Sequence, residues 1–202
     1  MAKKDLPKDL QSLYFPSAKE PVFVDVPAMQ FAMVDGVGDP NTSKDFQEAL
    51  GALYGIAYTI KFAAKKAKGP EVLVMPLEAL WWSEGADILE ADKAGWSWRA
   101  MLMEPPSVTR RMFEESVNQL RERKNPPALG KVRLERWREG KAAQILHIGP
   151  YAAEGPNIER LHAFIRENGY RPTGKHHEIY LGDPRRSAPE KLKTVIRQPA
   201  TR

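Results

Sequence analysis

The chain has 202 residues, of which 42% are hydrophobic and 28% charged, and its 31 lysines and arginines outnumber 26 acidic residues. Such a composition is typical of a globular protein with its own core and excludes a disordered chain. The sequence contains no cysteine, which excludes disulfide bridges, zinc–thiolate sites and thiol catalysis. No apolar run has the length of a signal peptide or a membrane span, so we expect a cytoplasmic protein without membrane contacts.

Alternating apolar residues over 22–34 predict a first strand, which leads into a turn that starts at Asp35. A helix should follow, because residues 41–43 are good N-caps and apolar residues then recur at helical spacing. Gly51 and Gly55 lie four residues apart in this helix, and we interpret them as points of close packing on a sheet.

Two more strands are predicted over 72–82 and 96–103, joined by a loop over 83–95. The first half of the chain therefore has the order β-α-β-β. Consecutive prolines then break the chain before a connector helix, which is expected over about 107–125.

The second half begins with the segments 131–137 and 142–148, which flank an Arg-Glu-Gly-Lys turn and predict a hairpin. A helix over about 154–168 follows, and strands over 175–181 and 192–197 end the chain. Helix and paired strands thus recur in the order of the first half.

This repetition predicts an α+β fold of two β-α-β-β repeats related by a pseudo-two-fold axis, with a ligand groove between them. We expect one domain over 20–199, preceded by an N-terminal extension over 1–19. The first repeat should span about 20–104 and the second about 130–199.

The richest segment for chemistry is 175–181. In a strand, His176, Glu178 and Tyr180 share one face, and His177 points to the other. Glu178, with its pKa raised by aromatic surroundings, could take a proton from water, and Tyr180 could donate to an oxyanion. A solvated strand face explains the same spacing. Because the adjacent histidines diverge, no metal site is expected here.

Four of the five tryptophans cluster on two strands expected to be neighbours. They are Trp81, Trp82, Trp96 and Trp98. Indole rings offer large flat surfaces and attract cations, which favours a planar or a cationic aromatic ligand. Core packing against the helices explains the cluster equally well. Adjacent residues of a strand point to opposite faces, so one of the first pair is expected to lie in the core.

Basic residues concentrate over 110–141, where ten lysines and arginines face five glutamates. This segment accounts for the net charge of +5. Both signs alternate there and no helix-turn-helix or RNA-binding motif accompanies them, so nucleic acid is not the expected partner.

The chain resembles the GyrI-like small-molecule-binding family. The resemblance rests on His147-Ile-Gly-Pro-Tyr151, on the block from His176 to Arg186, and on the tryptophan pairs, and covers roughly 20–199. It implies the effector-binding fold of transcription activators, with a shallow groove for hydrophobic drugs and dyes. About twenty residues precede the first strand, too few for a DNA-binding domain, which favours a free-standing binder or enzyme.

Standalone members similar to this chain look like hydrolases of cyclopropane-bearing genotoxins. The resemblance implies that Glu178 is the base that activates water and that Tyr180 positions the water or the substrate. The implied ligand contacts are Trp81, Trp82, Trp96, Trp98, Tyr151 and His176. No metal or organic cofactor is implied. The alternative is a non-catalytic protein, monomeric or dimeric, that sequesters drugs or presents them to a partner such as DNA gyrase.

Overall fold

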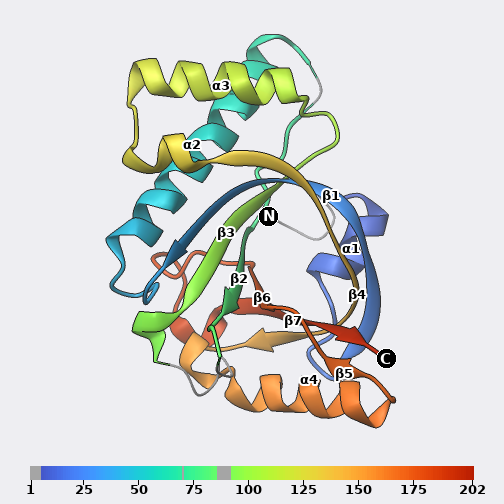
Figure 1. Cartoon of the computed structure of the whole chain (residues 1–202). Helices are drawn as coiled ribbons and strands as arrows, with labels where there is room; N and C mark the ends of the chain where they lie inside the picture. The colour runs from blue at the N-terminus through green and yellow to red at the C-terminus, as the bar shows by residue number, and fades with distance from the viewer. Residues whose placement is uncertain (1–5, 70, 86–91) are drawn as a thin grey trace. The chain divides into compact units, whose positions relative to one another are not determined.

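The computed structural model describes residues 6–69, 71–85 and 92–202, and it combines helices with antiparallel strands (Figure 1). The α-helices are α1 (Lys8–Tyr14), α2 (Lys44–Lys66), α3 (Arg110–Arg123) and α4 (Gly155–Glu167). The strands are β1 (Val22–Val37), β2 (Leu77–Trp82), β3 (Ser97–Glu104), β4 (Arg133–Ile148), β5 (Arg171–Pro172), β6 (His176–Tyr180) and β7 (Lys193–Thr201). Short 3₁₀ helices are η2 (Lys93–Gly95), η3 (Pro127–Lys131), η4 (Tyr151–Ala153) and η5 (Pro189–Lys191).

The described residues form two compact units. The first, which we call the β6 unit, consists of 6–28, 76–81 and 138–202. The second, the α2 unit, consists of the described residues within 29–75 and 82–137. Strands β1, β2 and β4 therefore each contribute residues to both units.

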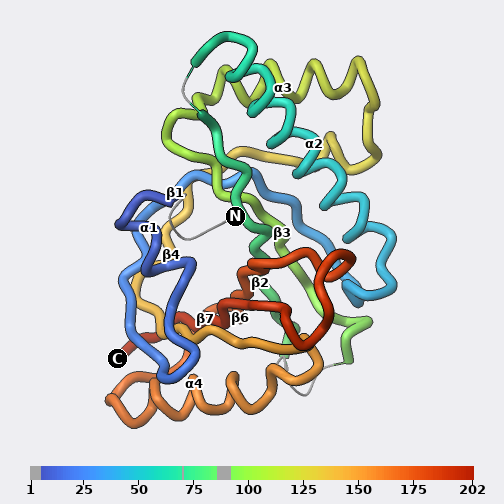
Figure 2. The backbone as a smooth tube through the Cα atoms, turned by 180° about the vertical axis from the view of Figure 1, so that it is seen from behind, coloured from blue at the N-terminus to red at the C-terminus, as the bar shows by residue number. Residues whose placement is uncertain are grey.

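In the β6 unit, β6 pairs antiparallel with both β2 and β7, and β7 also pairs with β4 and β5. Figure 2 shows β6 and β7 side by side from behind. Helix α4 lays Ile158, Leu161 and Ile165 against Ile145 and Ile196 of the sheet. Since a helix with apolar residues at i, i+3 and i+7 buries that one face, this cluster is the core of the unit.

In the α2 unit, β1 and β3 pair antiparallel along residues 30–37 and 97–104. The side chain of Ser43 caps α2 by accepting a hydrogen bond from the backbone N–H of Phe46 at 3.2 Å. Helix α3 lies beside α2 in both views (Figures 1 and 2). The ring of Trp98 is buried, packs edge-on against Phe46 at 5.0 Å, and would overlap any Cβ placed on Gly36.

The α+β class is confirmed, and the first half has the predicted order β1-α2-β2-β3. The second half has β4-α4-β6-β7 with the unpredicted two-residue strand β5 inserted after α4. Helices α2, α3 and α4 lie within the segments that the apolar periodicity indicates. Residues 86–91 of the loop predicted over 83–95, and residues 1–5 of the N-terminal extension, lie outside the described residues. No helix in the described part of the chain is long and apolar enough to cross a membrane.

The hairpin predicted around residue 140 is wrong. Residues 133–148 form one strand, β4, and the chain does not turn back at Arg138–Lys141. Gly140 takes a φ of +77°, which bends the strand locally without reversing it. The side chain of Glu139 is buried, so the turn-like sequence carries an inward-pointing carboxylate instead of a surface loop.

Three smaller expectations also fail. Strand β1 continues to Val37, because its pairing with β3 extends past Asp35. Strand β2 begins only at Leu77, directly after Pro76, which has no N–H for a ladder. Gly55 packs against a helix and not a sheet, since a Cβ there would lie 2.8 Å from the Leu120 side chain of α3.

Candidate functional site

Glu178 is held by hydrogen bonds to both of its carboxylate oxygens. Nε2 of His176 lies 3.1 Å from Oε1, and the hydroxyl of Tyr180 donates to Oε2 at 2.5 Å. The indole N–H of Trp81 donates in turn to the Tyr180 oxygen at 3.2 Å. The predicted common face of His176, Glu178 and Tyr180 is thereby confirmed, and the structure adds Trp81 to it.

The pairing of β2 with β6 explains this arrangement. Trp81 lies opposite His176, and Ala79 lies opposite Glu178. Directly opposed residues of antiparallel strands project from the same face, so the small Ala79 leaves room beside the carboxylate and Trp81 covers one end. The side chain of Glu178 is 14% exposed, whereas those of His176 and Trp81 are buried. The carboxylate is therefore fixed by buried neighbours but still reaches the surface.

Glu154 is a second carboxyl group at this site. It is buried at the start of α4, and it shares a side-chain hydrogen bond with Glu178. A hydrogen bond between two carboxyl groups needs a proton shared between them, since a carboxylate can only accept. Three residues earlier, the ring of Tyr151 meets that of Tyr180 edge-on at 5.5 Å. The segment before α4 thus adds an acid and an aromatic ring to the face of Glu178.

The pKa of Glu178 is shifted in the direction opposite to expectation. Burial raises it, but hydrogen bonds from His176, Tyr180 and Glu154 outweigh burial, so the net pKa lies below the usual value. Glu178 is therefore ionised at neutral pH, and the expected raised pKa is wrong. Burial and the charge of Glu178 raise the pKa of Tyr180 well above its usual value, which keeps its hydroxyl protonated.

The opposite face of β6 carries a buried ionic network. His177 Nε2 lies 3.0 Å from Glu78 Oε2, and its Nδ1 lies 2.9 Å from Glu139 Oε1. Arg197 Nη1 donates to Glu139 Oε2 at 3.1 Å. The hydroxyl of Tyr14 donates to Glu78 Oε1 at 2.5 Å. Both ring nitrogens of His177 thus face carboxyl groups, which favours the protonated ring.

Two acidic and two basic groups balance in this network, which explains how it tolerates burial. Burial raises the pKa of Glu139, but the charges of His177 and Arg197 bring it to about 2. Burial lowers the pKa of His177, yet Glu139 and Glu78 outweigh burial and hold it above its usual value. The network fixes β6 from behind the face that carries Glu178.

The structure places the other predicted ligand contacts in the α2 unit. Trp82 and Trp96 are half-buried, and Trp98 is buried against Phe46. The ligand-contact role of these three tryptophans stays a prediction. His176 and His177 point to opposite faces, as expected. Among the residues that the structure describes, no group of three or more metal-ligating side chains could hold a metal ion.

Sequence reasoning missed Glu154, Glu78 and Glu139. Glu154 was interpreted only as part of the start of α4, because acidic residues are common in the first turn of helices. Glu78 did give a usable signal, because a single charge inside the apolar run Leu-Glu-Ala-Leu-Trp-Trp requires a buried partner. Glu139 was hidden by a sequence that resembles a turn.

The whole chain resembles three solved structures from Listeria innocua. A conserved protein is 39% identical, with a TM-score of 0.89, and the match covers 96% of this chain and 98% of that chain. A protein described as a hydrolase is 36% identical, with a TM-score of 0.84 and coverage of 96% and 98%. A second hydrolase is 37% identical, with a TM-score of 0.85 and coverage of 96% and 97%. No curated protein matches the chain.

The family model of the GyrI-like small molecule binding domain matches residues 19–200. This range contains β2, β4, β5 and β6 and all but the last residue of β7, the strands of the sheet described around Glu178. It agrees with the range of about 20–199 over which the sequence resembles that family. The chain therefore belongs to the GyrI-like small-molecule-binding domain family.

Proposed function

We propose that this protein binds a flat, mostly apolar small molecule and hydrolyses an activated cyclopropane within it, with Glu178 as the general base. The observation that carries the proposal is an ionised carboxylate, 14% exposed, whose two oxygens are fixed by His176 and Tyr180. Two relatives described as hydrolases, 36% and 37% identical to this chain, support a hydrolytic reaction.

The proposed step adds one water molecule across a bond of the strained ring. The water oxygen bonds to the ring CH₂, and Glu178 takes the departing proton. The ring C–C bond breaks, and its electron pair moves into the conjugated carbonyl, whose oxygen becomes an enolate or phenolate. That oxygen is then protonated, with Glu178 returning the proton directly or through solvent. The net change is addition of water, and no electrons leave the system.

The neighbours of Glu178 have positioning roles in this proposal. The Tyr180 hydroxyl donates its proton to Glu178, and its oxygen accepts a hydrogen bond from Trp81. Tyr180 therefore orients the base and does not donate to the substrate. His176 holds the other carboxylate oxygen. Its Nδ1 is buried and has no hydrogen-bond partner among the described residues. Tyr151 supplies an aromatic edge for a planar ligand.

The test is the variant Glu178→Gln, assayed with a DNA alkylator in which a cyclopropane is conjugated to a carbonyl. The amide keeps the shape of the side chain but cannot accept a proton, so turnover should fall by about 10²-fold or more, with ligand affinity retained. Glu190→Gln is the matched control, because Glu190 is an exposed carboxylate in η5. Unchanged turnover in Glu178→Gln would show that Glu178 is not the base.

Binding without catalysis is the second candidate, and membership of a small-molecule-binding family favours it. It predicts that the alkylator saturably quenches tryptophan fluorescence but is recovered chemically intact from wild-type protein. Recovery of the hydrated, ring-opened product rules this candidate out.

A further inference from the structure

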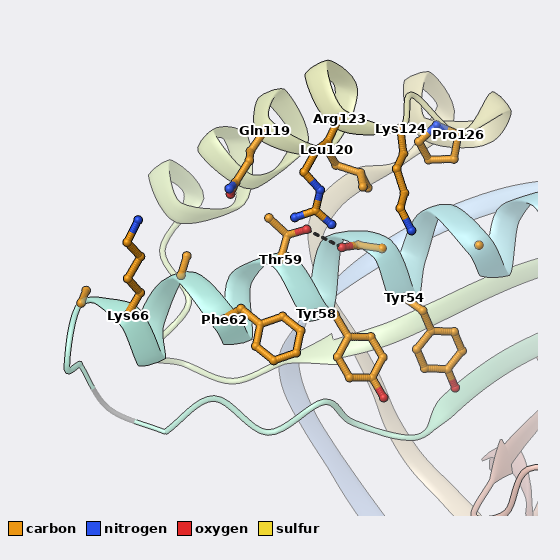
Figure 3. A pocket seen from close by; sticks show the side chains of 14 residues that line it. Tyr54, Tyr58, Thr59, Phe62, Lys66, Gln119, Leu120, Arg123, Lys124 and Pro126 are labelled. Carbon is orange, nitrogen blue, oxygen red and sulfur yellow. Dashed lines mark hydrogen bonds between the residues drawn. The ribbon is translucent and has the colours of Figure 1, made fainter.

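Helices α2 and α3 of the α2 unit border a groove of about 880 Å³ (Figure 3). None of the residues that hold Glu178 lines it, so the groove is a separate feature from the site described above. Its lining from α2 is Gly51, Tyr54, Gly55, Tyr58, Thr59, Phe62, Ala63, Lys66 and Ala67, and its lining from α3 and the following turn is Gln119, Leu120, Arg123, Lys124 and Pro126.

An aromatic row forms one side of the groove. Tyr54, Tyr58 and Phe62 follow at intervals of four residues, and their ring centroids lie 6.4 Å and 6.1 Å apart. Figure 3 shows the three rings along one flank of α2, away from α3. Tyr58 is 46% and Phe62 61% exposed. Large apolar side chains that adjoin one another and remain this exposed are typical of an interaction surface.

Two glycines of α2 differ in a way that points to an occupant. Gly55 has a packing reason, since the Leu120 side chain fills the space where its Cβ would lie. Gly51 has none among the described residues, because a Cβ there would meet no atom within 4 Å. A glycine at an exposed position inside a helix lowers stability by about 0.5–1 kcal/mol relative to alanine. Gly51 therefore leaves open space in the groove at a cost to the helix.

The charge of the groove has one sign. Lys66, Arg123 and Lys124 line it, and none of its lining residues in the described part of the chain is acidic. Figure 3 shows Lys66 near one end of the groove, with Arg123 and Lys124 along its α3 side. A second copy of the chain would bring the same cations to the contact, so charge disfavours a symmetric dimer through this surface. An acidic occupant is complementary to it.

We propose that this groove docks an acidic amphipathic helix of a partner protein. Its lining extends along α2 from Gly51 to Ala67, about 24 Å at 1.5 Å per residue, which is longer than a drug-sized molecule and fits a helix of similar length. Apolar anchors of the partner, spaced by three or four residues, pack on the aromatic row. Acidic residues beside those anchors pair with the cations of α3.

The test begins with selection from a displayed library of helical 16-residue peptides, using the full-length protein. Peptides that also bind the double variant Tyr58→Ala/Phe62→Ala are removed. We expect the survivors to combine net negative charge with apolar residues at i, i+3, i+4 and i+7. Survivors without that pattern, or no survivors, would overturn the proposal, and so would enrichment of basic peptides.

The best survivor is then titrated against single variants by fluorescence anisotropy. Phe62→Ala should weaken binding about tenfold or more, because it removes an exposed aromatic anchor without touching the core. Lys124→Glu should also weaken peptide binding, and its effect should grow as the salt concentration is lowered, because the substitution turns an attraction to the acidic peptide into a repulsion. Val37→Ala is the matched control, since Val37 is a 60% exposed apolar residue outside the groove and should leave affinity unchanged.

Two other occupants have their own signatures in the same experiments. Phe62-dependent binding to vesicles with anionic lipid, without peptide binding, would overturn the proposal and identify a membrane surface as the occupant of the groove. Phe62-dependent dimerisation in analytical ultracentrifugation, without peptide binding, would overturn the proposal and identify a second copy of the chain as the occupant. Loss of Glu178-dependent turnover leaves the groove unaffected, so the two proposals fail independently.

Discussion

Glu139→Gln tests the buried ionic network behind β6. The glutamate accepts hydrogen bonds from His177 and Arg197 and is itself buried. The amide removes the negative charge and leaves two buried cations against one carboxylate. Breaking a buried pair by removing one partner costs about 3–5 kcal/mol. For a chain of this size that corresponds to a fall in Tm of roughly 6–20 °C.

The assay is urea denaturation followed by circular dichroism, with Asp25→Asn as the matched control. Asp25 forms an exposed ion pair with Arg138, which is worth about 0–1 kcal/mol. Glu139→Gln/Arg197→Met should cost less than the sum of its single variants, because it removes one charge of each sign. A loss under about 1 kcal/mol in Glu139→Gln, or strict additivity in the double variant, would refute this account of the network.

The same network gives a pH window for stability. The pKa of Glu139 is lowered to about 2, so its contribution is present above the usual value of 4.5 and is lost as the pH falls toward 2. The pKa of His177 is raised, so its contribution is present below the usual value of 6.5 and is lost as the pH rises through the shifted pKa. Between these limits the free energy of unfolding of the wild type should exceed that of Glu139→Gln by the largest margin.

Four further variants probe other parts of the chain. Tyr180→Phe removes a donor to Glu178, so the acid limb of the turnover–pH profile should move to higher pH; an unmoved limb would contradict the positioning role. Gly55→Ala should lower the free energy of unfolding by about 1–3 kcal/mol, because its Cβ would contact a side chain of α3. Gly51→Ala should raise the free energy of unfolding by up to about 1 kcal/mol. Denaturation midpoints equal to that of the wild type would refute both predictions. Burial raises the pKa of Glu104 to about 8, so wild type should lose stability relative to Glu104→Gln as pH rises from 4.5 to about 8, and a constant difference would show an ordinary pKa.

The sequence was sufficient to predict those features that depend on the spacing of residues within one helix or strand. The alternation at His176, Glu178 and Tyr180 predicted their common face, and apolar spacing predicted α4, because both depend on neighbouring residues only. The partner of each strand is not a local property. Trp81 reaches Tyr180 across 99 positions of sequence, and His177 reaches Glu78 across the same separation.

Electrostatics were the least predictable part of the site. A glutamate among aromatic residues favours a raised pKa by burial alone, which was the expectation for Glu178. The sign reversed because hydrogen bonds with His176, Tyr180 and Glu154 outweigh burial, and of these partners Glu154 is not brought to the carboxylate by sequence spacing. The mistaken hairpin has a related cause, since Glu139 reads as a solvated turn residue until its buried partners are known.

Strand β6 is paired on both edges, and a buried network ties down its rear face. A carboxylate mounted on such a strand cannot shift to suit a ligand without breaking two ladders at once. Under the proposed function, we expect adaptation to ligands of different size to come from the short helical turn that carries Tyr151 and from the first residues of α4, including Glu154. Under that function, variants with an altered substrate range should therefore carry their changes in that turn, while Glu178 keeps its place on β6.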